Sequence, residues 1–419
     1  MRTVERIRNT TVFVEAPPSK AHTRRALVIG SLAEGQTTIE KPLLGEDQLN
    51  VMRCLKAMDI RIEQKQEKII VHGLAGKYRP IEVNLNVGES GVGMNFLTSA
   101  ACLGERPIVL TGAKRITERP IAEVVEALRQ LGCEIDYLLN EGYPPVRIHG
   151  GGIRGGRCRM SGRECSQYFS SVIVSAPYAE TAVTIICTDQ LTEKPYVDIT
   201  IQMAAEFGIQ TENNNYKKFV IPRGRYKGRT IRIEGDYSSA SFFFLAAAIC
   251  HSTVTVTNLR ADTKQGDRVF VELMKEMGCR IKTESDRITV EGDDLKAIER
   301  DMSDVPDLVP PTAIACAFAR GTSCLTNIGH LRHKECDRLE VLASQLQKMG
   351  VQARCDQTSL IIEGNRSAHG AVIDPHNDHR IAMSFAVAGL VTGDQRIDNP
   401  ACVAKSFPDF WERFEVFHK

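Results

Sequence analysis

The sequence predicts an α/β protein of two domains, each built from repeated units, and three observations support this. The chain has 419 residues, a length typical of two or three domains. In one recurring pattern, an apolar helix-like run ends at a small or polar turn and leads into a β-branched strand. In a second pattern, interleaved with the first, an amphipathic helix ends at a glycine-like stop and leads into a strand, a turn and another strand.

The first pattern appears six times, at a spacing of about 70 residues that is too long for a common solenoid repeat. Its turns lie near Gly35, Gly104, Glu180, His251, Gly321 and Gly393. The second pattern is visible five times, in segments that begin with VMRCLKAMD, VEALRQLG, IQMAAEFG, VELMKEMG and VLASQLQKMG. The alternating residues after each of these helices predict half-buried strands.

The sixth copy of the second pattern is split between the two ends of the chain. We expect its helix in FPDFWERFEVF and its hairpin in TVERIRNTTVFVEAP. Six βαβαββ units then predict two domains of three units, namely residues 18–232 and residues 1–17 together with 233–419. The chain would cross twice between them, and a cleft between two such halves is a natural ligand site that closes on binding.

Composition excludes several classes of protein. The 53 Lys and Arg residues nearly equal the 52 Asp and Glu residues, which argues against a nucleic-acid partner. No apolar run approaches the roughly 18 residues of a membrane span, and MRTVERIRNT lacks the apolar segment of a secretion signal. The thirteen cysteines include no C-x-x-C pair and are expected to be reduced. We therefore expect a cytoplasmic monomer with small-molecule partners and no membrane partner.

Three segments place polar groups at the start of an apolar helix: PPSKAHTRRAL, VGESGVGMNFL and GRECSQYFSSV. The N–H groups and the dipole at a helix start favour anions. Gly91 and Gly93 would also let a ligand approach the backbone closely. The alternative interpretation is that these residues only cap the helices.

The segment NIGHLRHKECDRLEVLASQL carries a denser set of charges. Lys334 and Arg338 are four residues apart and are expected on one helix face, with Glu335 between them. Two cations and a carboxylate suit a doubly charged ligand and a proton transfer, although a solvated charged face is the alternative. Three metal-binding side chains occur nearby: His330, His333 and Cys336. They have no evident fourth ligand, so we expect no metal site.

Further charged residues lie where loops meet helices. Asp307 follows Pro306 and opens an apolar helix, so it is either an N-cap or a general base whose pKa partial burial raises. Cations at such junctions are Arg25, Arg119, Arg380 and Lys405. In a chain of nearly neutral net charge, this concentration predicts a site for an anionic small molecule.

These segments resemble the 5-enolpyruvylshikimate-3-phosphate synthase family over nearly the whole chain. The resemblance is carried by ERPIAEVVEALRQLG, CSQYFSSVIVSAP, EGDYSSASFFFLAAA, VPDLVPP, RHKECDRL, NDHRIAMSFA and KSFPDFW. It implies a two-domain inside-out α/β barrel with three βαβαββ repeats in each domain and an active site in the interdomain cleft. It also implies transfer of the enolpyruvyl group of phosphoenolpyruvate to the 5-hydroxyl of shikimate 3-phosphate, with release of phosphate and without any cofactor.

The resemblance implies a role for each motif residue. The catalytic groups would be Lys20, Asp307 as the acceptor-side base, and Glu335, which shuttles the proton at the methylene carbon. Phosphoenolpyruvate would be bound by Lys20, Gly91, Arg119, Gln167, Arg338, Arg380 and Lys405. The acceptor would be bound by Lys20, Ala21, Arg25, Cys165, Ser166, Gln167, Glu193, Asp307 and Lys334. Within this set, Arg25 would hold the acceptor carboxylate, and Ser166 and Lys334 would hold its phosphate.

The chain departs from the family pattern at several positions, mainly on the acceptor side. Ala21 and Cys165 stand where the family usually has Ser, and Glu193 replaces a phosphate-binding Ser. Val92 and Asn95 replace the Thr and Arg of the motif N-A-G-T-A-M-R. The changes at Ala21, Cys165 and Glu193 each remove a hydroxyl and would weaken contacts to shikimate 3-phosphate.

These departures leave two alternatives open. One is a paralogous enolpyruvyl transferase that acts on a different hydroxylated acceptor. The related UDP-N-acetylglucosamine enolpyruvyl transferase is disfavoured, because its reactive Cys is absent from the loop GAKRITERP. The other is a non-catalytic binding protein, which would be expected to have lost Lys20, Asp307 or Glu335, and all three are present.

Overall fold

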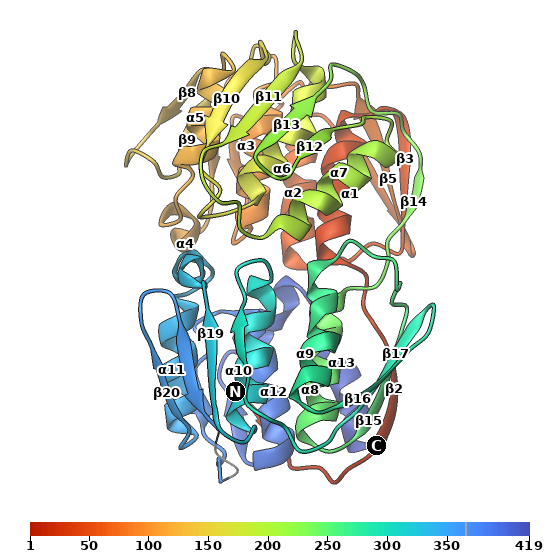
Figure 1. The fold of residues 1–419 in the computed structure, drawn as a ribbon. Helices are drawn as coiled ribbons and strands as arrows, with labels where there is room; N and C mark the ends of the chain where they lie inside the picture. Colours follow the sequence, from red (N-terminus) through yellow and green to blue (C-terminus); the bar gives the residue numbers. More distant parts are fainter. Residues whose placement is uncertain (365–366) are drawn as a thin grey trace. The chain divides into compact units, whose positions relative to one another are not determined.

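The computed structural model describes residues 1–364 and 367–419, and these divide into two compact units. The central unit is Pro18–Ile233, and the terminal unit joins Met1–Pro17 to Glu234–Lys419 (Figure 1). Helices and strands alternate through both units, which confirms the predicted α/β class. In the described part of the chain, no helix is both long enough and apolar enough to span a membrane.

The central unit contains three four-stranded sheets within its described residues. In each sheet the first two strands of the order are parallel and the remaining pairs are antiparallel. The orders are β14 (Thr230–Arg232), β3 (Glu34–Glu40), β5 (Lys68–Leu74) and β4 (Arg61–Lys65); β6 (Asn84–Asn86), β7 (Ile108–Thr111), β9 (Val146–Ile148) and β8 (Ile135–Tyr137); and β10 (Gly156–Met160), β11 (Val183–Cys187), β13 (Lys218–Ile221) and β12 (Glu212–Asn214).

The terminal unit repeats this arrangement with two four-stranded sheets and one three-stranded sheet among its described residues. The orders are β2 (Thr11–Glu15), β15 (Thr253–Thr257), β17 (Arg287–Glu291) and β16 (Arg280–Thr283); β18 (Glu299–Asp301), β19 (Thr322–Thr326), β21 (Leu360–Glu363) and β20 (Gln352–Cys355); and β22 (Val372–Ile373), β23 (Gln395–Ile397) and β1 (Arg2–Val4). Each order again begins with a parallel pair, except that β22 and β23 are followed directly by antiparallel β1.

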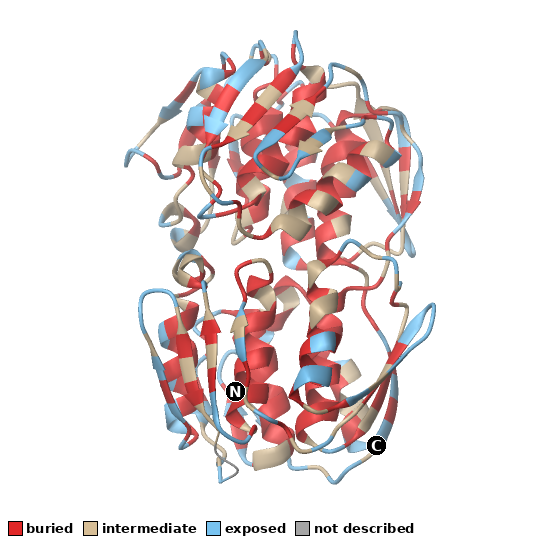
Figure 2. Ribbon diagram, in the orientation of Figure 1, coloured by how far each residue is buried: buried red, intermediate tan, exposed pale blue. Residues whose placement is uncertain are grey.

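The helices that precede the second strand of each sheet form the interior of their unit. They are α1 (Lys20–Leu32), α3 (Gly91–Ala101) and α6 (Gln167–Ser175) in the central unit, and α8 (Tyr237–Ile249), α10 (Val309–Ala317) and α12 (His379–Thr392) in the terminal unit. Within each unit these three helices pack on one another. All thirteen residues of α8 are buried, as expected for a helix that is apolar on every side. Figure 2 shows these helices as buried and the sheets as partly exposed.

The amphipathic helices follow the second strand of each sheet. They are α2 (Glu46–Ala57), α5 (Ala122–Gln130), α7 (Lys194–Glu206), α9 (Val269–Met277), α11 (Arg338–Lys348) and the short α13 (Phe410–Phe414). The remaining helical turns are α4 (Lys114–Thr117), η1 (Ala176–Tyr178), η2 (Gly266–Arg268), η3 (Pro306–Leu308), η4 (Gly329–His333), η5 (Pro400–Lys405) and η6 (Glu415–His418). The predicted glycine stops are confirmed, because Gly132, Gly208, Gly278 and Gly350 have positive φ just after α5, α7, α9 and α11.

The predicted N-terminal hairpin is wrong. Strand β1 does pair with β23 of the last sheet, but β2 pairs in parallel with β15 of a different sheet. The residues between the two strands cannot form a tight turn, because Ile7 N–H donates to Leu390 O and draws this segment along α12. The central unit closes in the same way, since β14 at its end pairs in parallel with β3 near its start. Each unit therefore takes the first strand of one sheet from a distant part of the chain.

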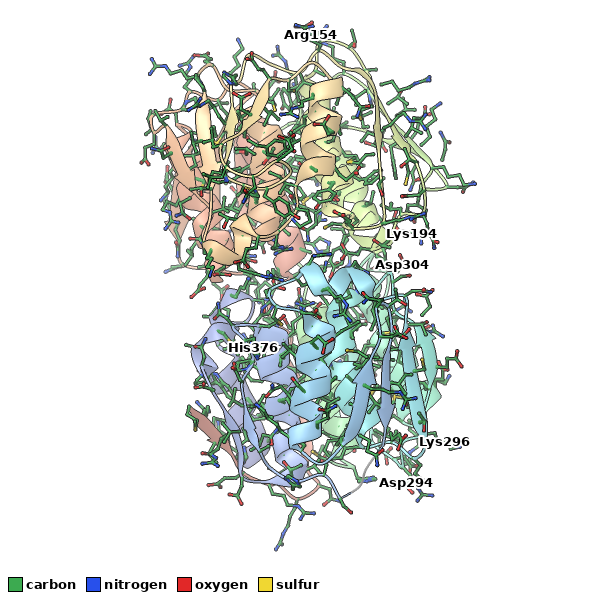
Figure 3. The ribbon with its side chains drawn as sticks, turned by 90° about the vertical axis from the view of Figure 1, so that its left-hand side faces the viewer. Arg154, Lys194, Asp294, Lys296, Asp304 and His376 are labelled. Atoms are coloured by element: carbon green, nitrogen blue, oxygen red, sulfur yellow. The ribbon has the colours of Figure 1, made fainter. Side chains whose placement is uncertain are left out.

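In each unit, different labelled side chains lie at the two opposite ends. In the terminal unit, Asp304 precedes η3 at one end, whereas Asp294 and Lys296 lie in loops at the other end (Figure 3). In the central unit, Lys194 begins α7 at one end and Arg154 lies at the opposite end (Figure 3). Asp304 and Lys194 thus mark the ends of the two units at which η3 and α7 begin.

Candidate active site

In the terminal unit, the candidate site is centred on Arg338, the first residue of α11. Its guanidinium donates from Nε to Asp378 Oδ2 at 2.7 Å, from Nη1 to Asp307 Oδ1 at 3.2 Å and from Nη2 to Glu335 Oε2 at 2.9 Å. The Arg338 side chain is 1% exposed, and Asp378 is fully buried. The three carboxylates come from η3, from the start of α12 and from the segment before α11, so this one side chain fixes three elements of the unit.

Two further cations extend this cluster. Arg380 Nη2 donates to Asp307 Oδ2 at 2.7 Å, and Lys405 Nζ lies 3.3 Å from Glu335 Oε1. Both cations are nearly buried, at 5% exposure each. Asp307 and Glu335 thus each contact two cations, which is the grouping that a doubly charged ligand and a proton transfer require. We call Asp307, Glu335, Arg338, Arg380 and Lys405 the terminal cluster.

The charges of this cluster shift the pKa values of its members. Burial alone would raise the pKa of Asp307, but Arg380 and Arg338 outweigh it and hold that pKa well below its ordinary value. The prediction that partial burial raises this pKa is therefore wrong. Burial would likewise lower the pKa of Arg338, but Asp378 and Glu335 raise it well above its ordinary value.

Sequence reasoning missed two carboxylates beside this cluster. Asp378 precedes α12, caps it by accepting from Arg380 N–H at 2.9 Å, and binds Arg338. Asp267 lies in η2 and accepts a short hydrogen bond from Ser238 at the start of α8. Burial and the nearby charge of Asp307 raise the pKa of Asp267 to about 7. The Q-G-D segment marks the position of Asp267, but nothing local indicates its burial.

The predicted helix over residues 334–338 is also wrong. Asp337 caps α11 by accepting from Glu340 N–H at 3.3 Å, so the helix begins only at Arg338. Lys334 ends the 3₁₀ turn η4 with extended backbone and is 8% exposed. Glu335 reaches Arg338 from outside the helix. In the described residues, no group of three or more His, Cys, Asp or Glu side chains is arranged to hold a metal ion.

In the central unit, the start of α1 forms a second group of charges. Ser19 caps the helix, and Lys20 is its first residue. Lys20 Nζ lies 2.9 Å from Asp47 Oδ2, and Arg24 Nη1 donates to the same oxygen at 3.0 Å. Asp47 comes from α2 and is another carboxylate that sequence reasoning missed. A cation at a helix start is unfavourable to the helix dipole, and Asp47 offsets this effect.

Arg25, one turn further along α1, is buried without a carboxylate among its hydrogen-bond acceptors. Its guanidinium donates to Thr200 Oγ1 at 2.7 Å, to Ala21 O at 3.0 Å and to Tyr196 O at 2.8 Å. It also lies over the ring of Phe96, 5.5 Å from the centroid. Burial and the charge of Arg24 lower the pKa of Arg25. A buried cation held by neutral acceptors suits an anionic group of a ligand.

A possible anion site lies at the start of α3. Ser90 caps the helix by accepting from Gly93 N–H at 3.1 Å, and Gly91 is its first residue. The guanidinium of Arg119 lies against Gly91, so close that a Cβ there would be 2.3 Å from Nη1. Only glycine lets the cation and the helix start approach in this way. Gln167, the first residue of α6, accepts from Asn95 Nδ2 at 3.2 Å.

The residues that depart from the family pattern lie around the starts of α6 and α7. Glu193 precedes α7 with left-handed backbone (φ 54°) and is fully buried. Ser166 Oγ donates to Glu193 Oε2 at 3.3 Å, and Cys165 Sγ lies 3.7 Å from the same oxygen. Val92 is buried inside α3. We call Lys20, Arg25, Gly91, Arg119, Ser166, Gln167 and Glu193 the central cluster.

The structure therefore brings the predicted residues together in two groups, one in each unit. All five members of the terminal cluster are linked by ion pairs. The central cluster consists of smaller contacts at the starts of four helices, α1, α3, α6 and α7. That both groups line one cleft between the domains stays a prediction.

Comparison with known proteins relates nearly the whole chain to one family. A family model described as EPSP synthase (3-phosphoshikimate 1-carboxyvinyltransferase) matches residues 4–414. A relative named 3-phosphoshikimate 1-carboxyvinyltransferase from Methanoculleus marisnigri is 43% identical over 95% of this chain and 94% of its own. A relative of the same name from Haemophilus influenzae is 38% identical over 96% and 95%. The solved EPSP synthase of Acinetobacter baumannii matches with a TM-score of 0.82 and 28% identity, covering 98% and 96% of the two chains.

The relatives are named carboxyvinyltransferases, so the chain is a transferase, and its clusters combine the cations and acid–base groups that such a transfer uses. The chain belongs to the EPSP synthase family, as the family model and the relatives at up to 43% identity show.

Proposed function

We propose that the chain transfers the enolpyruvyl group from phosphoenolpyruvate to the 5-hydroxyl of shikimate 3-phosphate and releases phosphate, a step of the shikimate pathway towards chorismate and the aromatic amino acids. The observation that carries this proposal is the terminal cluster. There, three nearly buried cations contact the two carboxylates that would handle protons. Family membership favours this acceptor over any other.

The reaction requires a proton to be added and then removed. Protonation of the methylene carbon of phosphoenolpyruvate lets the acceptor hydroxyl attack the adjacent carbon, which forms a tetrahedral ketal. Loss of a methyl proton and of phosphate then restores the double bond. Glu335 would deliver and remove the proton at carbon, and Asp307 would accept the proton of the attacking hydroxyl, helped by Lys20. Arg338, Arg380 and Lys405 would stabilise the charge on the phosphate that leaves.

The ion pairs of the terminal cluster suggest how donor binding prepares Asp307. Without a ligand, Arg380 and Arg338 hold the pKa of Asp307 well below its ordinary value, which makes it a poor base. The anionic groups of phosphoenolpyruvate would share these cations. The positive charge felt by Asp307 would then fall, its pKa would rise, and it would become a better proton acceptor.

We propose that the central cluster holds the rest of the two substrates. Gly91, Arg119 and Gln167 would bind phosphoenolpyruvate together with the cations of the terminal cluster. Arg25, with its neutral partners, would bind the acceptor carboxylate. Ser166 would bind the acceptor phosphate together with Lys334. Since both clusters would contact phosphoenolpyruvate, substitution of its binding residues in either unit, such as Arg119 or Arg338, should raise the KM for phosphoenolpyruvate.

The deciding experiment measures phosphate release from phosphoenolpyruvate with shikimate 3-phosphate and, separately, with unphosphorylated shikimate. We expect turnover with the phosphorylated acceptor and much slower turnover without the phosphate. Mass spectrometry of the product should show the added carboxyvinyl group. No release with shikimate 3-phosphate, or equal release with both acceptors, would contradict the proposed acceptor.

We also propose that the chain acts as a monomer in the cytoplasm, with neither nucleic acid nor membrane as a partner. The nearly equal numbers of basic and acidic residues argue against nucleic-acid and anionic-lipid partners, because such partners favour a basic excess. Sedimentation analysis at micromolar concentration should give a single species of the monomer mass. A stable dimer would refute the proposed monomer.

A further inference from the structure

Asn95 on α3 contacts Gln167, the first residue of α6, although the two residues are far apart in the sequence. Asn95 Nδ2 donates to Gln167 Oε1 at 3.2 Å, and Asn95 is 5% exposed. We propose that Asn95 is a positioning residue, which holds the carboxamide of Gln167 with its N–H end toward phosphoenolpyruvate. This inference rests on the proposed function, in which Gln167 contacts the donor.

The two helices are joined next to this pair by buried hydrogen bonds. Ser171 Oγ on α6 donates to Asn95 O at 2.6 Å, and Ser99 Oγ on α3 donates to Ser171 O at 2.7 Å. Both serines are fully buried. Ser171 lies one turn after Gln167, so these bonds fix the backbone that carries the pair. The contact between Asn95 and Gln167 then needs only the right side-chain rotamers.

Asn95 also lies on the face of α3 that carries the anion site. It follows Gly91 by four residues, and residues at this spacing share a helix face. Gly91 is the residue against which the guanidinium of Arg119 lies. An anion held at Gly91 and Arg119 would therefore be on the same side of α3 as the contact with Gln167. All of these residues belong to the central unit.

The orientation of a carboxamide decides whether it attracts or repels an anion. One end of Gln167 carries an oxygen acceptor and the other carries two N–H donors. The N–H donor of Asn95 binds the oxygen end, which leaves the donor end of Gln167 for the ligand. With an apolar residue at position 95, nothing would favour this orientation. The fraction of molecules ready to bind the donor would then fall, and apparent affinity falls in proportion.

The test is a double-mutant cycle with Asn95→Leu and Gln167→Ala, read by steady-state kinetics at saturating shikimate 3-phosphate. Leu has the branched skeleton of Asn, with bulkier methyl groups in place of the amide, and no hydrogen-bonding group. We expect Asn95→Leu to raise the KM for phosphoenolpyruvate between about two- and tenfold, the range of one neutral hydrogen bond. The kcat should stay within about twofold, and the KM for shikimate 3-phosphate, to which the resemblance also assigns Gln167, should change less than the KM for phosphoenolpyruvate. In the Gln167→Ala background, Asn95→Leu should have no further effect.

Two controls separate positioning from structural support. Ser99→Ala removes bonds between α3 and α6 without touching Gln167. Because the bond from Ser171 Oγ to Asn95 O remains, this variant should leave the KM for phosphoenolpyruvate unchanged. Thermal unfolding of each variant reports any loss of stability. If Asn95→Leu does not fold, Asn95→Ala takes its place in the cycle, since it only removes atoms.

The outcomes distinguish this inference from the proposed function. In an active enzyme, two results would overturn the positioning role. One is an equal rise in the KM for phosphoenolpyruvate on Asn95→Leu with and without Gln167. The other is a rise on Ser99→Ala as large as that on Asn95→Leu. A wild-type protein that neither turns over nor binds phosphoenolpyruvate by calorimetry would overturn the proposed function, and the inference with it. A rise in the KM for phosphoenolpyruvate that disappears in the Gln167→Ala background would support both the positioning role of Asn95 and the proposed function.

Discussion

The two clusters of cations differ in how their charges are compensated. In the terminal cluster, each of the three cations forms an ion pair with a buried or partly buried carboxylate. In the central cluster, the buried Arg25 donates only to neutral oxygen atoms in the contacts that the structure describes. Carboxylates of the protein therefore compensate most of the positive charge of the terminal cluster, whereas Arg25 has a positive charge to offer an anion.

This difference matches the distribution of departures from the family pattern. Ala21, Val92, Asn95, Cys165 and Glu193 all lie in the central unit. The terminal cluster keeps every residue that the family resemblance requires. A network in which one arginine binds three carboxylates tolerates few changes, because any loss leaves a buried charge without its partner. The central unit is consequently where the substrate preference of this chain can vary.

The largest expected effect comes from the terminal cluster. Glu335→Gln keeps the shape of the side chain and removes its ability to transfer a proton. We expect kcat to fall by roughly 10²–10⁴-fold, the usual contribution of a general acid–base group, while the KM values change little. Rapid-quench and steady-state assays measure both. Glu340→Gln on the exposed side of α11 is the matched control and should be neutral. Wild-type turnover by Glu335→Gln would remove Glu335 from the mechanism.

A matched pair of arginine substitutions tests the comparison itself. Arg338→Met leaves three carboxylates without their common partner, so we expect a loss of about 3–5 kcal/mol in the free energy of unfolding. It should also weaken phosphoenolpyruvate binding by about 1.5–3 kcal/mol. Arg25→Met removes a buried charge that neutral groups hold, so stability should change far less while the KM for the acceptor rises.

Urea unfolding and calorimetric titration of both ligands measure these effects. Equal loss of stability in the two variants would contradict the contrast between Arg338, which carboxylates hold, and Arg25, which neutral oxygen atoms hold. If Arg25→Met left the affinity for the acceptor unchanged, Arg25 would not be the residue that binds the acceptor carboxylate.

One carboxyl beside the terminal cluster gives a stability effect that depends on pH. The pKa of Asp267 is about 7 in the folded protein, above its ordinary value. The folded state therefore binds a proton that the unfolded chain has lost between pH of about 4 and 7, so this residue makes unfolding easier as the pH rises through that interval. Asp267→Asn removes the effect and can still accept from Ser238. We expect the melting temperature of Asp267→Asn to exceed that of wild type by roughly 5 °C at pH 8.

The difference should shrink towards zero as the pH falls to about 4, because Asp267 is then protonated in both states. Glu272→Gln, an exposed change on α9, is the control and should follow the wild type at every pH. A difference between Asp267→Asn and wild type that does not vary with pH would mean that the Asp267 carboxyl does not titrate in this range.

Local signals were enough to predict some of the site. Polar residues before apolar runs predicted helix starts in three segments, and α1, α3 and α6 begin there. Ser19 and Ser90 cap their helices, whereas Ser166 forms no capping hydrogen bond. The glycine stops were also predictable from local sequence, because the residue just after a helix often has positive φ, which favours glycine. The resemblance added the roles of these residues, which local patterns could not supply.

Contacts between distant segments could not be predicted in this way. Asp378 binds Arg338 across 40 residues, and Asp47 binds Arg24 across 23, but neither carboxylate stands in a pattern that marks it as buried. The N-terminal hairpin failed for a related reason. Alternation predicts that β2 is a strand, but only the packing of the folded unit selects β15 as its partner.

The smallest expected effect concerns Glu193 in the central cluster. Its buried carboxylate accepts from Ser166 Oγ at 3.3 Å, and Ser166 is the residue that would hold the acceptor phosphate. Ser166 has one hydroxyl proton, so it cannot donate to the carboxylate and to the phosphate together. Bringing a phosphate there also places two anions close to each other. Glu193→Ser should therefore tighten shikimate 3-phosphate binding about tenfold, or about 1.4 kcal/mol, without changing phosphoenolpyruvate binding.

Glu193→Gln separates the two causes, because it keeps the size of the side chain and removes the charge. If repulsion dominates, calorimetric titration should find shikimate 3-phosphate bound more tightly by both variants than by wild type. If competition for the Ser166 hydroxyl dominates, Glu193→Ser alone should improve binding, since the Gln oxygen still accepts from Ser166. Unchanged affinity in both variants would place Glu193 outside the acceptor site, and the departure at position 193 would then have no bearing on the acceptor.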